Sequence, residues 1–173
     1  MNEVLKQFIE TNIPHIEAEM YGLVDKIQAP ENLKESMLYS LKAGGKRIRP
    51  LFVAAVCEMY NKPLAASYTV GAAVEMIHTY SLIHDDLPCM DDDELRRGKP
   101  TNHVVYGEDV ATLAGDALNT LAFGVLARMD SPAEKRIELV QLLSVAAGAE
   151  GMVGGQILDM EGERRLLNLT ELE

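Results

Sequence analysis

The chain has 173 residues, a formal net charge of −11 at pH 7 and 47% hydrophobic residues. This length fits one domain or part of one, and the apolar fraction can form a core, which excludes a disordered chain. The negative charge disfavours nucleic acid and anionic membranes as partners, so an anionic ligand would need a local group of cations or a bridging metal ion. Cys57 and Cys89 make no disulfide framework and fit reduced thiols in a cytoplasmic protein.

Nearly every segment carries apolar residues at the three- and four-residue spacing of an amphipathic helix. Residues 5–13 show this spacing, and Pro14 is expected to break or restart the helix because proline has no N–H to donate. No alternating apolar pattern argues for a sheet, so the predicted class is all-α with short turns. The later helices are expected, in chain order, over about 15–27, 31–43, 50–60, 64–87, 108–128, 131–147 and 150–163.

The segment 64–84 is long and apolar, and it contains Glu75, His78 and His84. A carboxylate in the middle of such a segment is costly in lipid. We therefore expect a buried helix of a soluble bundle and no stable membrane insertion. Its many Ala, Ser and Gly residues would let neighbouring helices approach closely.

An acidic run, DDLPCMDDDE at residues 85–94, follows this helix directly. Pro88 disfavours helix at the residue before it, so the chain should curl back there and bring Asp91 to Asp85. Carboxylates at a helix C-terminus are unfavourable unless a cation offsets them, and hard oxygen ligands suit Mg²⁺. A solvated acidic turn is the alternative, and an EF-hand loop is excluded because its sixth position, Met90, should be glycine.

Two arginines, Arg96 and Arg97, come next in the chain. They are candidates for bidentate capture of phosphate oxygens. Local pairing with Asp92 and Asp93 at helical spacing is the alternative.

A second basic group, GGKRIRP at residues 44–50, has the Gly-Lys of a P-loop but neither its spacing nor a preceding strand, so a nucleotide site is rejected. A glycine turn between helices could instead display Lys46 and Arg49 toward one anion. A helix C-cap followed by ordinary surface charges is the alternative. His78 lies two helical turns before Asp85 on nearly the same face, although a lone histidine on an apolar helix can also be a core residue.

Four motifs in order and spacing, GGKRIRP, EMIHTYSLIHDDLPCMDDDELRRGKPTNH, LAGDALNTLAF and GGQILDMEGE, resemble the trans-isoprenyl diphosphate synthases. Within that family the resemblance is closest to the bacterial farnesyl diphosphate synthases, and it covers essentially all of the chain. It implies an all-α, isoprenoid-synthase helical bundle around a central cavity. Residues 1–173 would form the N-terminal portion of a single such domain.

The family's second aspartate-rich motif and its later lysines are absent from this sequence. We therefore expect the fragment alone to have little or no synthase activity. Residues 170–173 have the form of a capping box, which starts a helix and agrees with a longer protein, unless it arises by chance.

The resemblance implies a Mg²⁺-dependent prenyltransferase of isoprenoid biosynthesis, which is cytoplasmic and a homodimer. Its reaction would condense isopentenyl diphosphate with dimethylallyl or geranyl diphosphate to give farnesyl diphosphate and pyrophosphate. The alternatives are a geranyl or geranylgeranyl diphosphate synthase, and a non-catalytic diphosphate-binding subunit.

Carried over by position, the resemblance makes Asp85 and Asp91 the Mg²⁺ ligands, with Asp86 supporting them, and places Arg96 on the allylic diphosphate. The residues expected to hold the diphosphate of isopentenyl diphosphate are Lys46, Arg49, His78 and Arg97.

Gln156, with Asp159, belongs to the motif that lines the allylic side. Tyr80 and Ser81 are the expected chain-length residues. Tyr80 lies five residues before Asp85, about 7.5 Å deeper along the helix axis, where its ring would stop a growing prenyl tail. Ordinary core packing of Tyr80 is the alternative.

Overall fold

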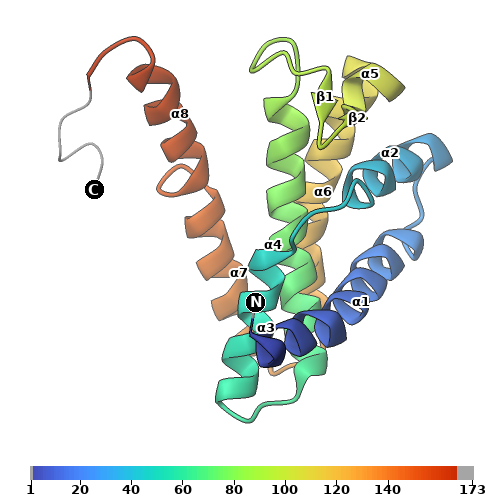
Figure 1. Cartoon of the computed structure of the whole chain (residues 1–173), viewed down its shortest axis with the longest axis vertical. Helices are drawn as coiled ribbons and strands as arrows, with labels where there is room; N and C mark the ends of the chain where they lie inside the picture. The colour runs from blue at the N-terminus through green and yellow to red at the C-terminus, as the bar shows by residue number, and fades with distance from the viewer. Residues whose placement is uncertain (1, 167–173) are drawn as a thin grey trace. The chain divides into compact units, whose positions relative to one another are not determined.

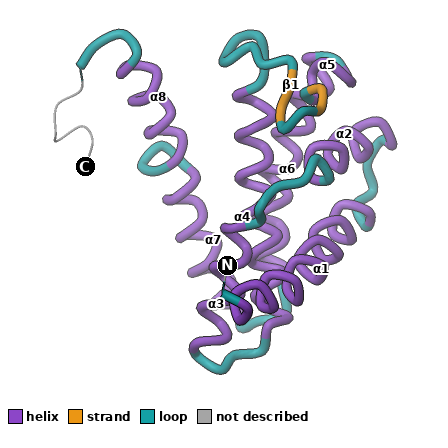
Figure 2. The backbone as a smooth tube through the Cα atoms, in the orientation of Figure 1, coloured by secondary structure: helices purple, strands orange, loops and turns teal. Residues whose placement is uncertain are grey.

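The computed structural model describes residues 2–166, and contacts divide the chain into two compact units, residues 1–130 and 131–173 (Figure 1). In chain order the elements are α1 (Glu3–Asp25), α2 (Glu31–Leu41), α3 (Ile48–Met59), α4 (Leu64–Asp85), β1 (Leu95–Arg96), β2 (Lys99–Pro100), α5 (Asn102–Tyr106), α6 (Glu108–Arg128), α7 (Ala133–Ala147) and α8 (Met152–Gly162). The predicted all-α class is confirmed, since the strands are confined to one short hairpin in the described residues (Figure 2).

Helix α4 is the centre of the first unit, where it packs against α6, α3 and α1. Small residues allow these close approaches, as expected from the sequence. A Cβ on Gly71 would lie 2.8 Å from the Cβ of Pro50 in α3, so a larger residue would push the two helices apart. Apolar side chains such as Met76 and Ile83 fill the remaining core, and full burial of each contributes about 1.5–3 kcal/mol.

Helix α1 runs without interruption through Pro14, so the expected break at this residue is wrong. Proline costs the helix one hydrogen bond, but residues on both sides of it belong to one buried stripe. Asn12, Ile16, Met20 and Val24 are all buried. The burial of this stripe outweighs the lost bond, because tertiary packing supplies most of a helix's stability.

The hairpin of β1 and β2 and the short helix α5 were not predicted from the sequence. Arg97 and Gly98 form the hairpin turn, and both have positive φ (55° and 76°), as two-residue hairpin turns commonly require. Asn102, which follows the hairpin, is 2% exposed and bonds Ser36 and Ser40 of α2. The segment that carries the two predicted phosphate-binding arginines is thus fixed to α2.

The second unit consists of α7 and α8, in which Ala147 is buried and α8 has no buried residue among those described. Two stretches of the described chain, Glu108–Arg128 and Ala133–Gly162, are long and apolar enough to cross a membrane by length and composition. Core helices of soluble proteins pass the same test, and α6 packs against α4. The predicted capping box at 170–173 lies outside the described residues.

Candidate diphosphate-binding site

The aspartate turn at the end of α4 has the shape expected from Pro88. The helix ends at Asp85, and the backbone N–H of Asp91 donates to the carbonyl of Asp85 at 2.8 Å. A further bond from the Asp92 N–H to the Leu87 carbonyl closes the turn. The prediction that the chain curls back to bring Asp91 beside Asp85 is confirmed.

The charges of this turn are not balanced by the protein. Burial raises the pKa of Asp85, the negative charge of Asp91 raises it further, and Arg96 only partly opposes them. The described residues contain no group of three or more His, Cys, Asp or Glu side chains placed to hold a metal ion. Two neighbouring carboxylates still fit Mg²⁺, since that ion keeps several waters and needs only one or two carboxylates from the protein.

Asp86 plays a different part from its neighbours. Its side chain is 5% exposed, and its Oδ1 accepts from the Nε and Nη2 of Arg96 at 2.7 and 2.6 Å. The hydrogen bond to Asp86 raises the pKa of Arg96. The alternative of Asp92–Arg96 and Asp93–Arg97 pairs at helical spacing is not found, because these residues lie in a turn and a hairpin. Arg96 instead approaches Asp93, at 3.8 Å, in addition to its closer pairing with Asp86.

The structure brings all the predicted isopentenyl diphosphate ligands to one cavity of about 410 Å³. It is lined by Gly45, Lys46, Arg47, Ile48, Arg49, Glu75, His78 and Arg97. Two of its lining residues, His78 and Arg97, also line a neighbouring pocket with Asp86 and Arg96, which places the cavity close to the turn. Four different segments meet here, namely the turn after α2, the first turn of α3, the middle of α4 and the hairpin. Because these segments supply several cations and a histidine, the cavity can hold an anion about the size of a diphosphate.

His78 and Arg97 lie on the α4 and hairpin sides of this cavity. Burial lowers the pKa of His78, and the positive charges of Arg49, Arg97 and Arg96 lower it further, against Glu75. Arg97 donates from Nη1 to the carbonyl of Gly44. The hairpin thus touches the glycine turn, and a Cβ on Gly45 would lie 2.5 Å from the Arg97 guanidinium, which would then have to move away.

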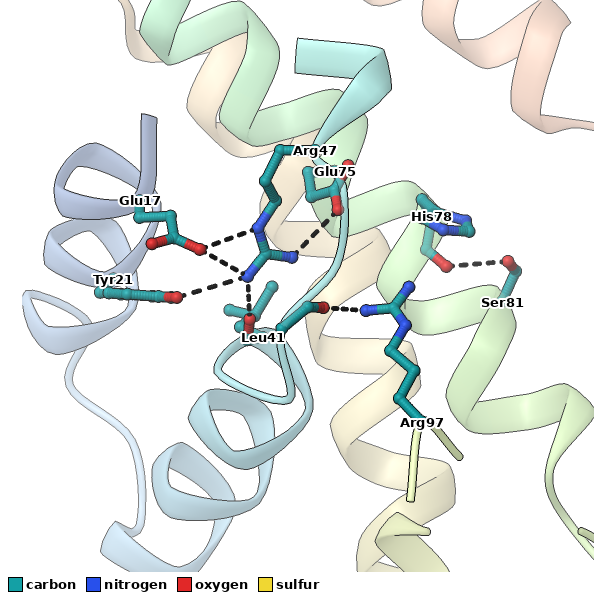
Figure 3. A network of polar contacts seen from close by, with 9 residues as sticks. Glu17, Tyr21, Leu41, Arg47, Glu75, His78, Ser81 and Arg97 are labelled. Atoms are coloured by element: carbon teal, nitrogen blue, oxygen red, sulfur yellow. Dashed lines mark hydrogen bonds and ion pairs between the residues drawn. The ribbon is translucent and has the colours of Figure 1, made fainter. Parts of the chain in front are cut away.

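A buried network that the sequence reasoning missed includes two of the lining residues, Arg47 and Glu75, and extends from them to α1 and α2 (Figure 3). Arg47 bonds Glu17 and Tyr21 of α1, Glu75 of α4 and the carbonyl of Leu41 at the end of α2. The sequence pattern GGKRIRP gave no signal to separate Arg47 from its neighbours. Arg47 is a basic residue like Lys46 and Arg49, and it differs from them only in the direction of its side chain.

The predicted chain-length residues occupy the α4 face near the aspartate turn. Tyr80 is 8% exposed and packs edge-on against His84, with 5.7 Å between ring centroids. The His84 ring is itself held against α6, since its Nε2 lies 3.0 Å from the Thr112 carbonyl. Ser81 donates its hydroxyl to the His78 carbonyl. Their role in chain length stays a prediction.

Gln156 lies half-buried in α8 of the second unit, with Asp159 exposed one turn later. Gln156 belongs to the second unit and the cavity to the first, and the positions of the two units relative to each other are not determined (Figure 1). The predicted place of Gln156 on the allylic side stays a prediction.

The fold and site define an all-α protein with an aspartate turn at the end of its central helix and a cationic cavity beside it. A family model described as Polyprenyl synthetase matches residues 30–173. The chain belongs to this family, which confirms the resemblance inferred from the four motifs.

Similar proteins share both the sequence and the fold. The chain is 56% identical over 176 residues to the farnesyl diphosphate synthase of Bacillus subtilis (strain 168), covering 100% of this chain and 60% of that protein. It is 52% identical over 141 residues to geranylgeranyl pyrophosphate synthase 3, chloroplastic, of Arabidopsis thaliana, covering 80% and 39%. A solved apo structure of an FPP/GFPP synthase from Zymomonas mobilis has a TM-score of 0.90 at 42% identity, covering 99% and 64%. The chain thus spans about 60% of the curated Bacillus relative.

Proposed function

We propose that this chain supplies the aspartate turn and the isopentenyl diphosphate pocket of a trans-prenyltransferase that makes farnesyl diphosphate and pyrophosphate. The observation that carries the proposal is the meeting of Lys46, Arg49, His78 and Arg97 around one cavity. The cavity lies beside a turn in which Asp91 is bonded back to Asp85. Its substrates would be isopentenyl diphosphate and an allylic diphosphate, dimethylallyl or geranyl.

In this reaction the C–O bond of the allylic diphosphate breaks and its electron pair leaves with the diphosphate. Mg²⁺ held by Asp85 and Asp91 would supply positive charge against that leaving group. Arg96, fixed by Asp86, offers its guanidinium to the same charge as it develops, and a preorganised cation costs no reorganisation at that moment.

The cationic cavity has the other task of holding isopentenyl diphosphate so that its alkene faces the allylic carbon. The alkene attacks that carbon, a new C–C bond forms, and a proton leaves the adjacent carbon for the released pyrophosphate. Lys46 and Arg49 are exposed and free to turn toward a diphosphate, whereas Arg97 reaches the cavity from the hairpin. Holding the two substrates together in this way converts a bimolecular step into a unimolecular one.

A C15 product is supported by Tyr80, because its buried ring lies on α4 below the aspartate turn and is kept in place by His84. The similarity to a geranylgeranyl pyrophosphate synthase favours a C20 product as the second candidate. Mg²⁺ as cofactor, a cytoplasmic location, a homodimer and the absence of stable membrane insertion are further parts of the proposal, and they rest on the family resemblance.

The test is a chimera in which residues 1–173 are joined to the part of the Bacillus subtilis synthase beyond the matched region. With Mg²⁺, isopentenyl diphosphate and geranyl diphosphate, we expect farnesyl diphosphate as the main product, and none from the Asp85→Ala, Asp91→Ala double variant. Tyr80→Ala should then give products longer than C15. A chimera that folds but yields no C15 product would contradict the farnesyl assignment, and longer products with Tyr80 intact would favour the second candidate.

A further inference from the structure

Arg47 is the one member of the basic turn at residues 46–49 whose side chain is withdrawn from solvent. That side chain is 2% exposed, whereas Lys46 and Arg49 on either side are exposed. Each of its three guanidinium nitrogens has a protein acceptor. Nε donates to Glu17 at 3.0 Å, Nη1 to Glu75 at 3.1 Å and Nη2 to the Leu41 carbonyl at 2.6 Å.

These contacts make Arg47 unsuited to bind a diphosphate itself. Two carboxylates already neutralise its charge, and Glu75 is as deeply buried as the guanidinium, at 4% exposure. Burial alone would lower the pKa of Arg47, but the hydrogen bonds to Glu75 and Glu17 reverse this and raise it. The hydrogen-bonding capacity and charge of the guanidinium are therefore used by contacts within the protein.

The backbone around Arg47 explains the structural effect of these side-chain contacts. Gly44, Gly45 and Arg47 have φ of 90°, 141° and 49°, so the turn repeatedly enters the left-handed region. Glycine adopts that region freely, but for arginine it costs on the order of 1 kcal/mol or more. The carbonyl of Arg47 also accepts the first bond of α3, from the Leu51 N–H at 3.0 Å. A side chain fixed on α1, α2 and α4 holds this strained residue in place.

We propose that Arg47 is a positioning residue that sets the direction of Lys46 and Arg49 into the cationic cavity. Anchored through Glu17 and Glu75, it fixes the left-handed backbone on which the two cations are displayed. This inference deepens the proposed function and rests on it in taking the anion of the cavity to be a diphosphate.

Positioning and simple electrostatics give opposite expectations for Glu17. Its carboxylate lies behind the cavity and does not line it. Removing a nearby negative charge should strengthen the binding of an anion if charge alone matters. If Glu17 acts by holding Arg47, the same removal should weaken binding.

Helix α1 offers a matched control for this test. Glu19 lies two residues after Glu17, is also half-buried, and links α1 to α4 by accepting from Thr69 at 2.8 Å. Glu17→Ala and Glu19→Ala each remove one negative charge and one side-chain link from α1 to the rest of the first unit, but only Glu17→Ala releases Arg47. Arg47→Lys is a third variant, which keeps the charge and loses the planar fork.

The experiment measures two quantities on the 173-residue chain. The first is amide hydrogen exchange of residues 43–51 without ligand, and the second is the Kd for inorganic pyrophosphate by calorimetry. Glu17→Ala and Arg47→Lys should both speed exchange in this segment and weaken pyrophosphate binding roughly three- to tenfold, the range for one lost hydrogen bond. Glu19→Ala should match the wild type in both.

Exchange and affinity in Glu17→Ala equal to those of Glu19→Ala, or tighter binding, would overturn the positioning role. A wild-type chain that does not bind pyrophosphate would overturn the proposed diphosphate site. In that case the exchange of residues 43–51 alone decides whether Arg47 holds the turn.

Discussion

Two neighbouring aspartates of the turn have opposite effects on the folded chain. Asp86 is 4% exposed and bonded to Arg96, so its charge is compensated. Asp91 is exposed and its charge raises the pKa of Asp85, so the pair repels. Burial and partner thus distinguish residues of one type within one motif: Asp86 is held in a structural pair, and Asp91 keeps the exposed carboxylate that the proposed metal site requires.

We therefore expect Asp86→Asn and Asp91→Asn to shift stability in opposite directions without metal. Asp86→Asn should lower the free energy of unfolding by about 1–3 kcal/mol, because Arg96 loses a charged acceptor. Asp91→Asn should raise it by about 0.2–1 kcal/mol, since the variant removes a repulsion near the surface. Urea denaturation with EDTA measures both, and equal losses in the two variants would contradict the division of roles.

His78 should make pyrophosphate binding dependent on pH. In the free chain burial and then the positive charges of Arg49, Arg97 and Arg96 lower its pKa, against Glu75, so the ring is protonated less readily than an ordinary histidine. A bound diphosphate opposes those cations and raises the pKa again. Binding should therefore take up protons, and affinity should increase as the pH falls from 7 toward the lowered pKa of the free chain.

Calorimetry in two buffers of different ionisation enthalpy measures this proton uptake. His78→Gln should reduce the proton uptake to the protons that pyrophosphate itself takes up on binding. The control is His15→Gln, which should leave the uptake unchanged, because His15 lies on α1 and stacks on Tyr68. Equal uptake in the wild type and His78→Gln would show that His78 does not change its protonation on binding.

At the scale of a residue, sequence reasoning found the charged groups proposed to bind the ligand and missed two buried residues that hold the surrounding segments, Arg47 and Asn102. Lys46, Arg49 and the aspartates stand out because charges in a motif suggest a ligand. Arg47 carries the same charge as its neighbours, and Asn102 resembles any loop asparagine. Their roles depend on which way a turn directs them, and that is set by positive φ values and by helices distant in sequence.

At the scale of an element, the contact between α4 and α6 depends on a notch at Gly115. A Cβ there would lie 2.2 Å from the His84 Nε2, so the ring would have to leave its contacts with the Thr112 carbonyl and Tyr80. The His84 ring that lies over Gly115 is also the ring against which Tyr80, the predicted chain-length residue, packs. The motif that contains Gly115 was recognised in the sequence, but not the reason for its glycine.

Gly115→Ala should lower the free energy of unfolding by about 1–3 kcal/mol, the usual cost of overpacking. The control is Gly124→Ala on the same helix, where the Cβ meets only the flexible end of Arg128. This control should be neutral or stabilise by about 0.5–1 kcal/mol, because alanine favours helix over glycine. Thermal or urea denaturation compares the two variants. If Gly115→Ala is as stable as Gly124→Ala, the α4–α6 contact accommodates an added methyl group at Gly115 without strain.

Helix positions were predictable from apolar spacing, and the exceptions have local causes. Pro14 suggested a break because the pattern shows the lost N–H but not the buried stripe that runs past it. The hairpin at 95–100 was missed because Arg-Gly is a rare hairpin turn and the strands are two residues long. In both cases packing against another element decided the outcome.

At the scale of the whole molecule, the described chain leaves several large apolar side chains exposed to solvent. Along α3 the side chains of Ile48, Phe52 and Val56 are 49%, 68% and 51% exposed. In the second unit Leu142 is 68% and Ile157 54% exposed. The chain also spans about 60% of the Bacillus subtilis relative. Surfaces of this kind cannot exclude water from an allylic cation.

We expect the 173-residue chain to bind pyrophosphate but to make no farnesyl diphosphate. Ionisation of an allylic diphosphate requires charge stabilisation on more than one side, and a cation formed in an open site is captured by water. Incubation with Mg²⁺, isopentenyl diphosphate and geranyl diphosphate should therefore give no product, or geraniol from hydrolysis. The control is the chimera with the remaining part of the Bacillus subtilis synthase, which should convert the same substrates and so show that the assay detects product. Farnesyl diphosphate from the chain alone at a rate close to that of the chimera would mean that the first unit closes its own cavity, and the exposed apolar faces of α3, α7 and α8 would then need another explanation.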